Sequence, residues 1–133
     1  HYYIHSAINK NNLKVNKTPR PTAPFYQKTK NWIIDSVQIY IGEYYNRNIK
    51  LSQLASLYFI HPHYLCKLFK KETGINFSRY VNQIRIENAK IFLCQTNDKI
   101  INIALKVGYN NVTYFNRVFK EYTGMTPGEY RDK

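Results

Sequence analysis

Apolar residues recur at intervals of three and four along most of this chain, which is the period of amphipathic α-helices. The first helix is expected over about residues 28–45. Its apolar stripe consists of Trp32, Ile33, Val37, Tyr40, Ile41 and Tyr44. Near the other end of the chain, Thr126 can cap a short terminal helix with Pro127 in its first turn. The whole pattern predicts an all-α protein of about seven helices.

An internal repeat organises the rest of the pattern. Residues 64–74 align with residues 114–124 at an offset of 50, and Leu54-Ala55 aligns with Ile103-Ala104 at an offset of 49. Each copy predicts a short helix, a tight turn and a longer helix, which is the helix-turn-helix arrangement. The apolar faces of the short helices consist of Leu51, Leu54, Ala55 and Tyr58 in the first copy and Ile100, Ile103, Ala104 and Val107 in the second.

Turn and cap residues agree with these boundaries. Gly108 is free to adopt a positive φ in the second turn. Pro62 suits the first position of a helix, and Asn110 or Asn111 can cap the matching helix of the second copy. Both longer helices are expected to end at a glycine. These glycines are Gly74 and Gly124.

Between the copies, residues 76–95 predict one continuous helix without glycine or proline. It has two apolar stripes on nearly opposite faces, whereas a surface helix normally has one. The first stripe consists of Phe77, Tyr80, Val81, Ile84, Ile91 and Phe92, and the second of Ile86, Ala89 and Leu93. We therefore expect this helix to pack between two subdomains. Its length of about 30 Å is close to the roughly 34–36 Å between successive major-groove faces of B-DNA.

The charge of the chain favours an anionic partner. It has 20 Lys and Arg against 8 Asp and Glu in 133 residues, a formal net charge of +12. Nucleic acid, an anionic membrane and an acidic protein all fit such an excess. The basic residues are spread over the predicted helices, which favours a folded basic surface over a polybasic tail.

Composition sets the first residues apart, and the helical pattern and the repeat divide the rest of the chain into three parts. Residues 1–24 contain no acid and three of the five prolines, and we expect a basic arm or interdomain linker there. Residues 25–75 are expected to form a first helix-turn-helix subdomain and residues 76–95 the linker helix. Residues 96–133 are expected to form a second helix-turn-helix subdomain.

Several classes of protein fit the sequence poorly. No apolar run reaches the roughly 18 residues of a membrane span, and the first residues lack the apolar core of a secretory signal. Cys66 and Cys94 are too few for a disulfide scaffold and fit the reducing cytoplasm, with a structural role expected for Cys94. His61, His63 and Cys66 lie close in sequence, but a structural zinc site needs four ligands. With no Cys, His and acid constellation for a nucleophilic enzyme, we expect no catalysis, no metal and no cofactor.

A dense motif covers the second copy and the residues after it. It consists of Ile103-Ala104, Val107-Gly108-Tyr109, Tyr114-Phe115, Arg117, Phe119-Lys120, Gly124-Met125-Thr126-Pro127 and Tyr130-Arg131. The first copy adds Leu51, Leu54-Ala55 and Phe69-Lys70, and the linker helix adds Arg85-Ile86 and Ala89. Over about residues 28–131 the chain resembles the AraC/XylS family.

The resemblance implies the DNA-binding module of a cytoplasmic transcription regulator, whose two recognition helices enter successive major grooves. Double-stranded DNA is then the partner, and the resemblance leaves room for RNA polymerase and for a sensor domain in a longer chain. The alternative is a basic helical module that binds an acidic protein or an anionic membrane surface. The core-like spacing of the aromatic residues argues against that alternative. Double-stranded RNA fits less well, because its deep, narrow major groove does not admit a recognition helix.

The first recognition helix is expected to run from Pro62 to about residue 71. The base-reading positions of the family map onto His63, Cys66 and Lys67. The Lys67 ammonium can donate to guanine O6 or N7, and the His63 ring can donate or accept. Contacts with phosphate are expected from neighbouring lysines, which add affinity without sequence information. These lysines are Lys70 and Lys71. The competing interpretation is a solvated basic helix face.

The second recognition helix is expected over about residues 111–122. Its outward residues, which are candidates for base contacts, are Val112, Thr113, Asn116 and Arg117. Arg117 can bind guanine bidentately, and Val112 or Thr113 can contact a thymine methyl group. Lys120 is a candidate for phosphate contact. Arg117 has an alternative partner in Glu121, four residues later.

Three positions depart from the family pattern. His61 stands where the family often has serine, and it is a weaker helix cap. Phe59 stands where a turn glycine is common, so a positive φ there would be strained. Val112 replaces a residue that is commonly polar.

Overall fold

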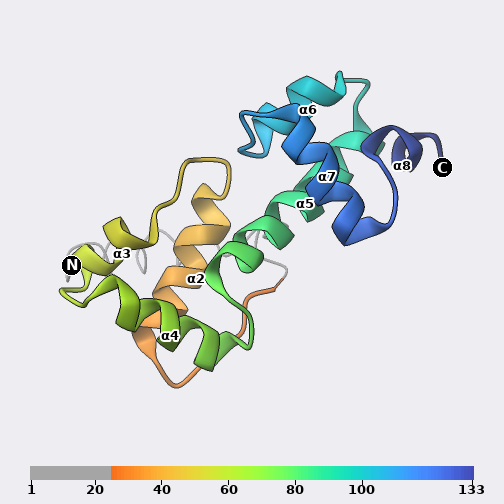
Figure 1. Ribbon diagram of the computed structural model, residues 1–133. Helices are drawn as coiled ribbons and strands as arrows, with labels where there is room; N and C mark the ends of the chain where they lie inside the picture. The colour runs from red at the N-terminus through yellow and green to blue at the C-terminus, as the bar shows by residue number, and fades with distance from the viewer. Residues whose placement is uncertain (1–24) are drawn as a thin grey trace.

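The computed structural model describes residues 25–133 (Figure 1). This part of the chain has seven α-helices and no strand, as the all-α prediction expects. The helices are α2 (Trp32–Tyr44), α3 (Leu51–Leu57), α4 (Pro62–Thr73), α5 (Phe77–Gln95), α6 (Ile100–Lys106), α7 (Val112–Thr123) and α8 (Pro127–Asp132). The arm or linker predicted over residues 1–24 lies outside the described residues.

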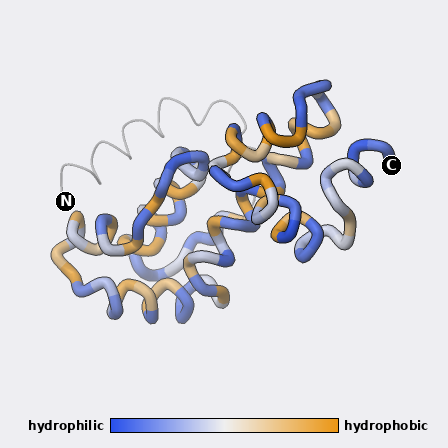
Figure 2. Tube along the Cα trace, turned by 45° about the horizontal axis from the view of Figure 1, so that its top comes forward, coloured by the Kyte–Doolittle hydropathy of each residue, from blue (hydrophilic) through white to orange (hydrophobic). Residues whose placement is uncertain are grey.

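Two helix-turn-helix units share one helix. The first unit comprises α2, α3 and α4, and the second comprises α6, α7 and α8, with α5 lying between them (Figure 1). Helix α5 packs against α4 on one side of the junction and against α6, α7 and α8 on the other. In Figure 2, hydrophobic and hydrophilic positions alternate along the helices of both units, as amphipathic helices require. The predicted arrangement of two units joined by a linker helix is confirmed.

The two helix-turn-helix turns share a backbone hydrogen bond and a positive φ, with different residues at the equivalent positions. The Ile60 N–H donates to the Ala55 carbonyl at 3.1 Å, and the Tyr109 N–H donates to the Ala104 carbonyl at 2.8 Å. Phe59 has a φ of 57° and Gly108 a φ of 108°. The strain expected at Phe59 is therefore present, because a left-handed conformation costs a side-chain-bearing residue about 1–2 kcal/mol.

Side-chain caps fix where the long helices begin. The His61 Nδ1 atom accepts from the His63 N–H at 3.0 Å, and the Asn111 amide oxygen accepts from the Tyr114 N–H at 2.9 Å. His61 therefore serves as a cap although serine is more usual there. Of the two asparagines expected as caps of α7, Asn111 is the one that caps it. The two helices end as predicted at left-handed glycines. These are Gly74 and Gly124, with φ of 87° and 82°.

Helix α2 begins later than its apolar period predicted, at Trp32 instead of about residue 28. The Asn31 side chain caps it by accepting from the backbone N–H groups of Ile33 and Ile34. Upstream, the Thr29 N–H and hydroxyl both donate to the Asp35 carboxylate, at 2.7 and 2.8 Å. The chain before α2 thus folds back over the helix N-terminus and cannot continue the helix.

The buried face of α2 also differs from the predicted stripe. Trp32 is 45% exposed, whereas Ile34 and the polar Gln38 are fully buried. The Gln38 side-chain amide exchanges two hydrogen bonds with the backbone of Gln27, at 2.8 and 2.9 Å. Its oxygen also accepts from the Tyr80 hydroxyl of α5 at 3.1 Å. Burial of Gln38 is therefore compensated by hydrogen bonds between segments distant in sequence, which a local period does not reveal.

The two stripes of α5 divide along its length. Tyr80, Val81 and Ile84 are buried in the first half, and the opposite stripe begins with Ile86. The first stripe does not continue to the end of the helix, because its later members are only half-buried. These are Ile91 and Phe92. The opposite apolar stripe is therefore added near the middle of α5, while the buried polar Asn88 still lies on the face of Ile84.

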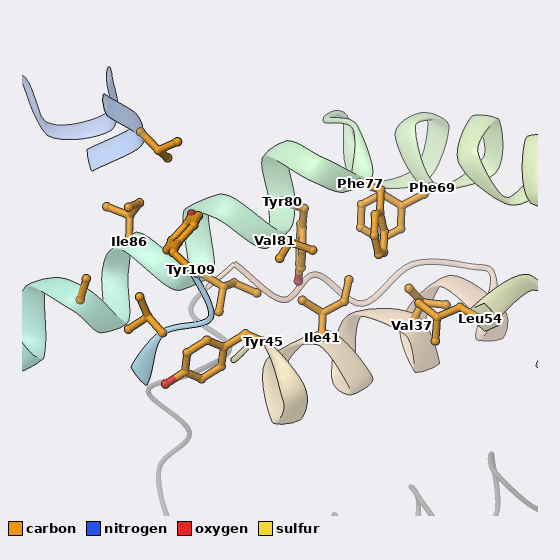
Figure 3. Close-up of a cluster of buried hydrophobic side chains, with 14 of the residues drawn as sticks. Val37, Ile41, Tyr45, Leu54, Phe69, Phe77, Tyr80, Val81, Ile86 and Tyr109 are labelled. Carbon is orange, nitrogen blue, oxygen red and sulfur yellow. The ribbon is translucent and has the colours of Figure 1, made fainter. Parts of the chain in front are cut away.

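The buried apolar side chains of the two units form one cluster. In Figure 3 they run from Val37 and Leu54 in the first unit, through Tyr80 and Val81 of α5, to Tyr109 of the second unit. A shared core of this kind couples the two units in stability as well as in position.

A test of the second turn compares two glycines with positive φ. A Cβ atom at Gly108 would lie 2.9 Å from Arg85 Nε and 3.0 Å from the Tyr45 carbonyl oxygen, whereas at Gly74 nothing lies within 4 Å. We expect Gly74→Ala to cost about 1 kcal/mol of unfolding free energy, and Gly108→Ala to cost about 2–4 kcal/mol because it adds overpacking to backbone strain. Urea denaturation measures both losses, and equal losses would contradict the steric argument.

Candidate nucleic-acid interface

Helices α4 and α7 present equivalent faces. Residues 61–75 and 111–125 have the same degree of burial at every position, so the repeat in sequence is a repeat in exposure. The side chains that anchor the two helices in the core are Leu65, Leu68 and Phe69 in α4 and Phe115, Val118 and Phe119 in α7. Everything between these anchors faces outward. In Figure 1 the two helices run in similar directions.

The candidate residues of α4 all lie on its exposed face. They are His63, Cys66, Lys67, Lys70 and Lys71. Among the residues that the structure describes, none of these three lysines has a carboxylate partner. Their ammonium groups are therefore presented to solvent together, along one side of a helix, and the free thiol of Cys66 is exposed next to Lys67.

The candidate residues of α7 are exposed with one exception. Thr113, Asn116, Arg117 and Lys120 face outward, whereas Val112 is half-buried and packs against the core. Val112 occupies the first position of the helix, as Pro62 does in α4. The expectation that Val112 faces outward is therefore only partly met.

Arg117 has an aromatic partner that was not among the candidate residues. Its guanidinium carbon lies 5.1 Å from the centroid of the Tyr114 ring, and no ion pair joins it to Glu121. Tyr114 is itself 41% exposed, and its ring lies 5.8 Å from that of the buried Tyr109. A cation held over an aromatic face loses part of its freedom before it meets a ligand. Tyr114 thus orients Arg117 on the exposed side of α7.

The sequence contained a signal for this missed residue. Tyr114 is identical to Tyr64 in the aligned first copy, and Tyr64 is 55% exposed. An aromatic residue that recurs at an exposed position of a repeat serves something other than the core. An open hollow at the start of α7 is lined by four residues of this face. They are Asn111, Thr113, Tyr114 and Arg117.

Most of the acidic residues lie outside the two recognition helices, although Glu72 belongs to α4 and the exposed Glu121 to α7. Of the 8 acids in the chain, Asp35 accepts hydrogen bonds from Thr29 and from Lys28 through its carboxylate. The Glu87 carboxylate pairs with Lys90 at 2.6 Å. A hydrogen bond from Lys106 lowers the pKa of Asp98, and the backbone N–H of Thr126 lowers the pKa of Glu129.

Chemistry of other kinds finds little support in the described residues. They contain no group of three or more His, Cys, Asp or Glu side chains placed to hold a metal ion. The His61 ring is occupied as a helix cap. Cys94, near the end of α5, is exposed, which contradicts the structural role expected for it. None of the helices that the structure describes is long and apolar enough to cross a membrane.

Sequence comparison places the chain among regulators. A family model described as a helix-turn-helix domain matches residues 54–133. The regulatory protein PocR of Salmonella typhimurium is 33% identical over 120 residues, which are 90% of this chain and 38% of that protein. The bifunctional transcriptional activator/DNA repair enzyme AdaA of Bacillus subtilis is 37% identical over 98 residues, which cover 74% of this chain and 46% of that protein. The chain thus spans less than half the length of these relatives.

Solved structures agree with the sequence comparison. The C-terminal domain of the two-component response regulator yesN from Fusobacterium nucleatum has a TM-score of 0.69 at 40% identity, covering 71% of this chain and 93% of that one. The DNA-binding domain of AdpA, solved in complex with a target DNA, has a TM-score of 0.70 at 17% identity and covers 74% of this chain and 89% of that one. At this identity the likeness shows the fold alone. With its paired helix-turn-helix units and linker helix, the chain belongs to the AraC/XylS family of transcription regulators.

Proposed function

We propose that this chain binds double-stranded DNA in a sequence-specific manner, with α4 and α7 in successive major grooves on one side of the duplex. The observation that carries the proposal is the pair of equivalent, exposed faces on α4 and α7, both attached to one continuous helix. Helix α5 has 19 residues and is therefore about 28 Å long, which is comparable to one turn of B-DNA.

Base contacts come from the part of each face nearest the helix N-terminus. In α4 these contacts are assigned to His63, Cys66 and Lys67. In α7 they are assigned to Thr113, Asn116 and Arg117, and Val112 offers only part of its side chain to a thymine methyl group. Arg117 has the sharpest role, because a guanidinium matches the two acceptors on the edge of guanine.

Phosphate contacts come from the later turns of both helices. Lys70, Lys71 and Lys120 are exposed one to two turns beyond the base-contacting residues. They supply affinity that falls with salt and does not depend on sequence.

The proposed DNA binding implies a role in transcription regulation. The chain acts in the cytoplasm as the non-enzymatic DNA-binding part of a transcription regulator. Its relatives are longer proteins, which supports a sensor domain elsewhere in a parent chain and leaves RNA polymerase as a second partner.

In-vitro selection from a randomised duplex library tests binding and specificity together. We expect enrichment of a site with two short conserved blocks centred about 10–10.5 base pairs apart. Vesicles of anionic phospholipid, titrated at the same salt concentration, serve as the competing ligand. Recovery of no preferred sequence, or binding to vesicles as tight as to the selected duplex, would contradict the proposal.

Replacing Arg117 tests its role in reading a base. We expect Arg117→Ala to lower affinity for the selected duplex by about 1–3 kcal/mol and to relax preference at one base position. Fluorescence anisotropy with single-base variants of the duplex measures both effects. An equal loss on random and selected DNA would assign Arg117 to the phosphate backbone instead.

Replacing Lys70 tests the phosphate assignment. We expect Lys70→Ala to reduce the slope of log affinity against log salt concentration by about one, whatever the DNA sequence. Lys90 is a matched control, because it is a lysine of α5 that pairs with Glu87 away from the proposed faces. Lys90→Ala should leave the slope unchanged, and an unchanged slope in Lys70→Ala would refute the contact.

The aromatic support of Arg117 can be tested by a double-mutant cycle. Tyr114→Leu removes the ring under the guanidinium, and we expect affinity for the selected duplex to fall about two- to fivefold, which corresponds to about 0.5–1 kcal/mol. Tyr114→Phe keeps the ring and should bind nearly as the parent does. In an Arg117→Ala background the effect of Tyr114→Leu should vanish. A persistent loss there would mean that Tyr114 contacts DNA itself.

A further inference from the structure

One side chain of α5 reaches the end of the first unit. The Arg85 Nε atom donates to the Tyr45 carbonyl at 2.7 Å, and its Nη2 atom donates to the Arg47 carbonyl at 2.8 Å. Both carbonyls lie just beyond the C-terminus of α2, where backbone acceptors lack partners within the helix. A planar guanidinium can serve two such acceptors at once, whereas a lysine ammonium cannot span them with the same fixed geometry.

The same guanidinium also contacts the second unit. Its carbon lies 5.1 Å from the centroid of the Tyr109 ring, and Tyr109 is the residue after Gly108 in the second turn. The Tyr109 side chain is 3% exposed and its hydroxyl donates to Asn82 of α5 at 2.6 Å. Arg85 therefore lies between the end of α2 and the turn that precedes α7.

The contact occupies a tightly packed junction. Gly108 leaves room for it, since a Cβ atom there would meet both the Arg85 side chain and the Tyr45 carbonyl. Burial lowers the pKa of Arg85 from its ordinary value, and the neighbouring Tyr109 opposes that shift. A guanidinium stays protonated under all ordinary conditions, so the hydrogen bonds to both carbonyls are charge-assisted.

Arg85 also lies where the opposite apolar stripe of α5 is added. Ile84 ends the stripe of the first half, and Ile86 begins the opposite stripe of the second half. A helix that takes on a second packing partner can bend or twist at that point with little loss of core contact. Arg85 opposes such motion, because its guanidinium is hydrogen-bonded to the first unit and packs on the Tyr109 ring of the second.

We propose that Arg85 is a positioning residue that locks the two helix-turn-helix units at one separation and orientation, and so sets the spacing of half-sites that the protein accepts on DNA. The proposal rests on the proposed function for its effect on DNA, whereas the lock itself is a property of the free protein. A rigid connection raises the effective concentration of the second helix at its half-site only when the spacing matches.

Arg131 provides a matched control. Its guanidinium also donates to backbone carbonyls, those of Leu93, Thr96 and Asp98, at 3.1, 3.2 and 2.7 Å. All of these bonds join α8 to the end of α5 and the loop after it. Arg131→Ala therefore removes a comparable set of bonds without touching the junction between the units.

The lock is tested first without DNA. A Cys94→Ser, Asn102→Cys variant carries one spin label on the native Cys66 of α4 and one on position 102 of α6. Pulsed electron paramagnetic resonance measures the distance between the two labels. We expect a narrow distribution that broadens in Arg85→Ala and Arg85→Lys but not in Arg131→Ala. An unchanged distribution in both Arg85 variants overturns the lock. Circular dichroism establishes that each variant is folded, and Arg85→Lys keeps the charge and the aliphatic stem if the alanine variant does not fold.

The consequence for DNA is tested with the duplex selected by the parent protein and with versions that add or remove one or two base pairs between its half-sites. We expect the parent to prefer one spacing by about tenfold or more, and Arg85→Ala to reduce that preference to about threefold or less. Affinity for a duplex with one scrambled half-site, and the salt slope, should not change.

Other outcomes separate the two proposals. A spacing preference retained in both Arg85 variants overturns the positioning role, and a salt slope reduced by about one would make Arg85 a phosphate contact instead. If the parent selects no DNA sequence at all, the proposed function fails, and the proposed effect on spacing fails with it. The spin-label distances still decide whether Arg85 locks the units.

Discussion

Both helix-turn-helix units pack on a single helix, and the relation between their exposed faces depends on how firmly they hold it. Helix α5 packs against both units within one continuous apolar core, and Asn82 in its first half already contacts Tyr109 of the second unit. Polar bonds secure both halves: Tyr80 donates to the buried Gln38, and Arg131 binds the carbonyls at the end of the helix. Arg85 joins the two units between these points. Helix α5 is thus bound to α2 near its start, to both units through Arg85 near its middle, and to α8 at its end.

The duplicated turns show how the same backbone can make different demands on sequence. Phe59 and Gly108 both adopt a positive φ at equivalent positions, yet only the second position has glycine. The Phe59 side chain is 80% exposed, so the first turn accommodates a large residue at this position. At Gly108 the close approach of Arg85 and the Tyr45 carbonyl adds a steric constraint. The two copies therefore differ at this position because the second turn packs closely against Arg85 and the Tyr45 carbonyl.

The distribution of charge distinguishes the stable framework from the exposed faces of α4 and α7. Carboxylates engage in helix caps and ion pairs, as Asp35, Asp98 and Glu129 do. The lysines of α4 have no carboxylate partner in the part of the chain that the structure describes, and Arg117 rests on an aromatic ring that keeps its charge intact. A protein arranged in this way attracts a polyanion without giving up ion pairs that stabilise its fold.

The sequence by itself determined the local features: the helices, most of their caps, the repeat, the two-sided linker helix and the exposed residues of α4 and α7. These follow from interactions within a few positions of each residue, which a period of 3.6 records. It misjudged the start of α2 and the environments of Trp32, Val112 and Cys94. It also missed the roles of Gln38, Tyr114 and Arg85. The recurrence of Tyr64 as Tyr114 was a signal in the sequence for one of these roles. Only the tertiary structure decided the other two, because Gln38 and Arg85 bind partners about 40 residues away and no local pattern encodes that proximity.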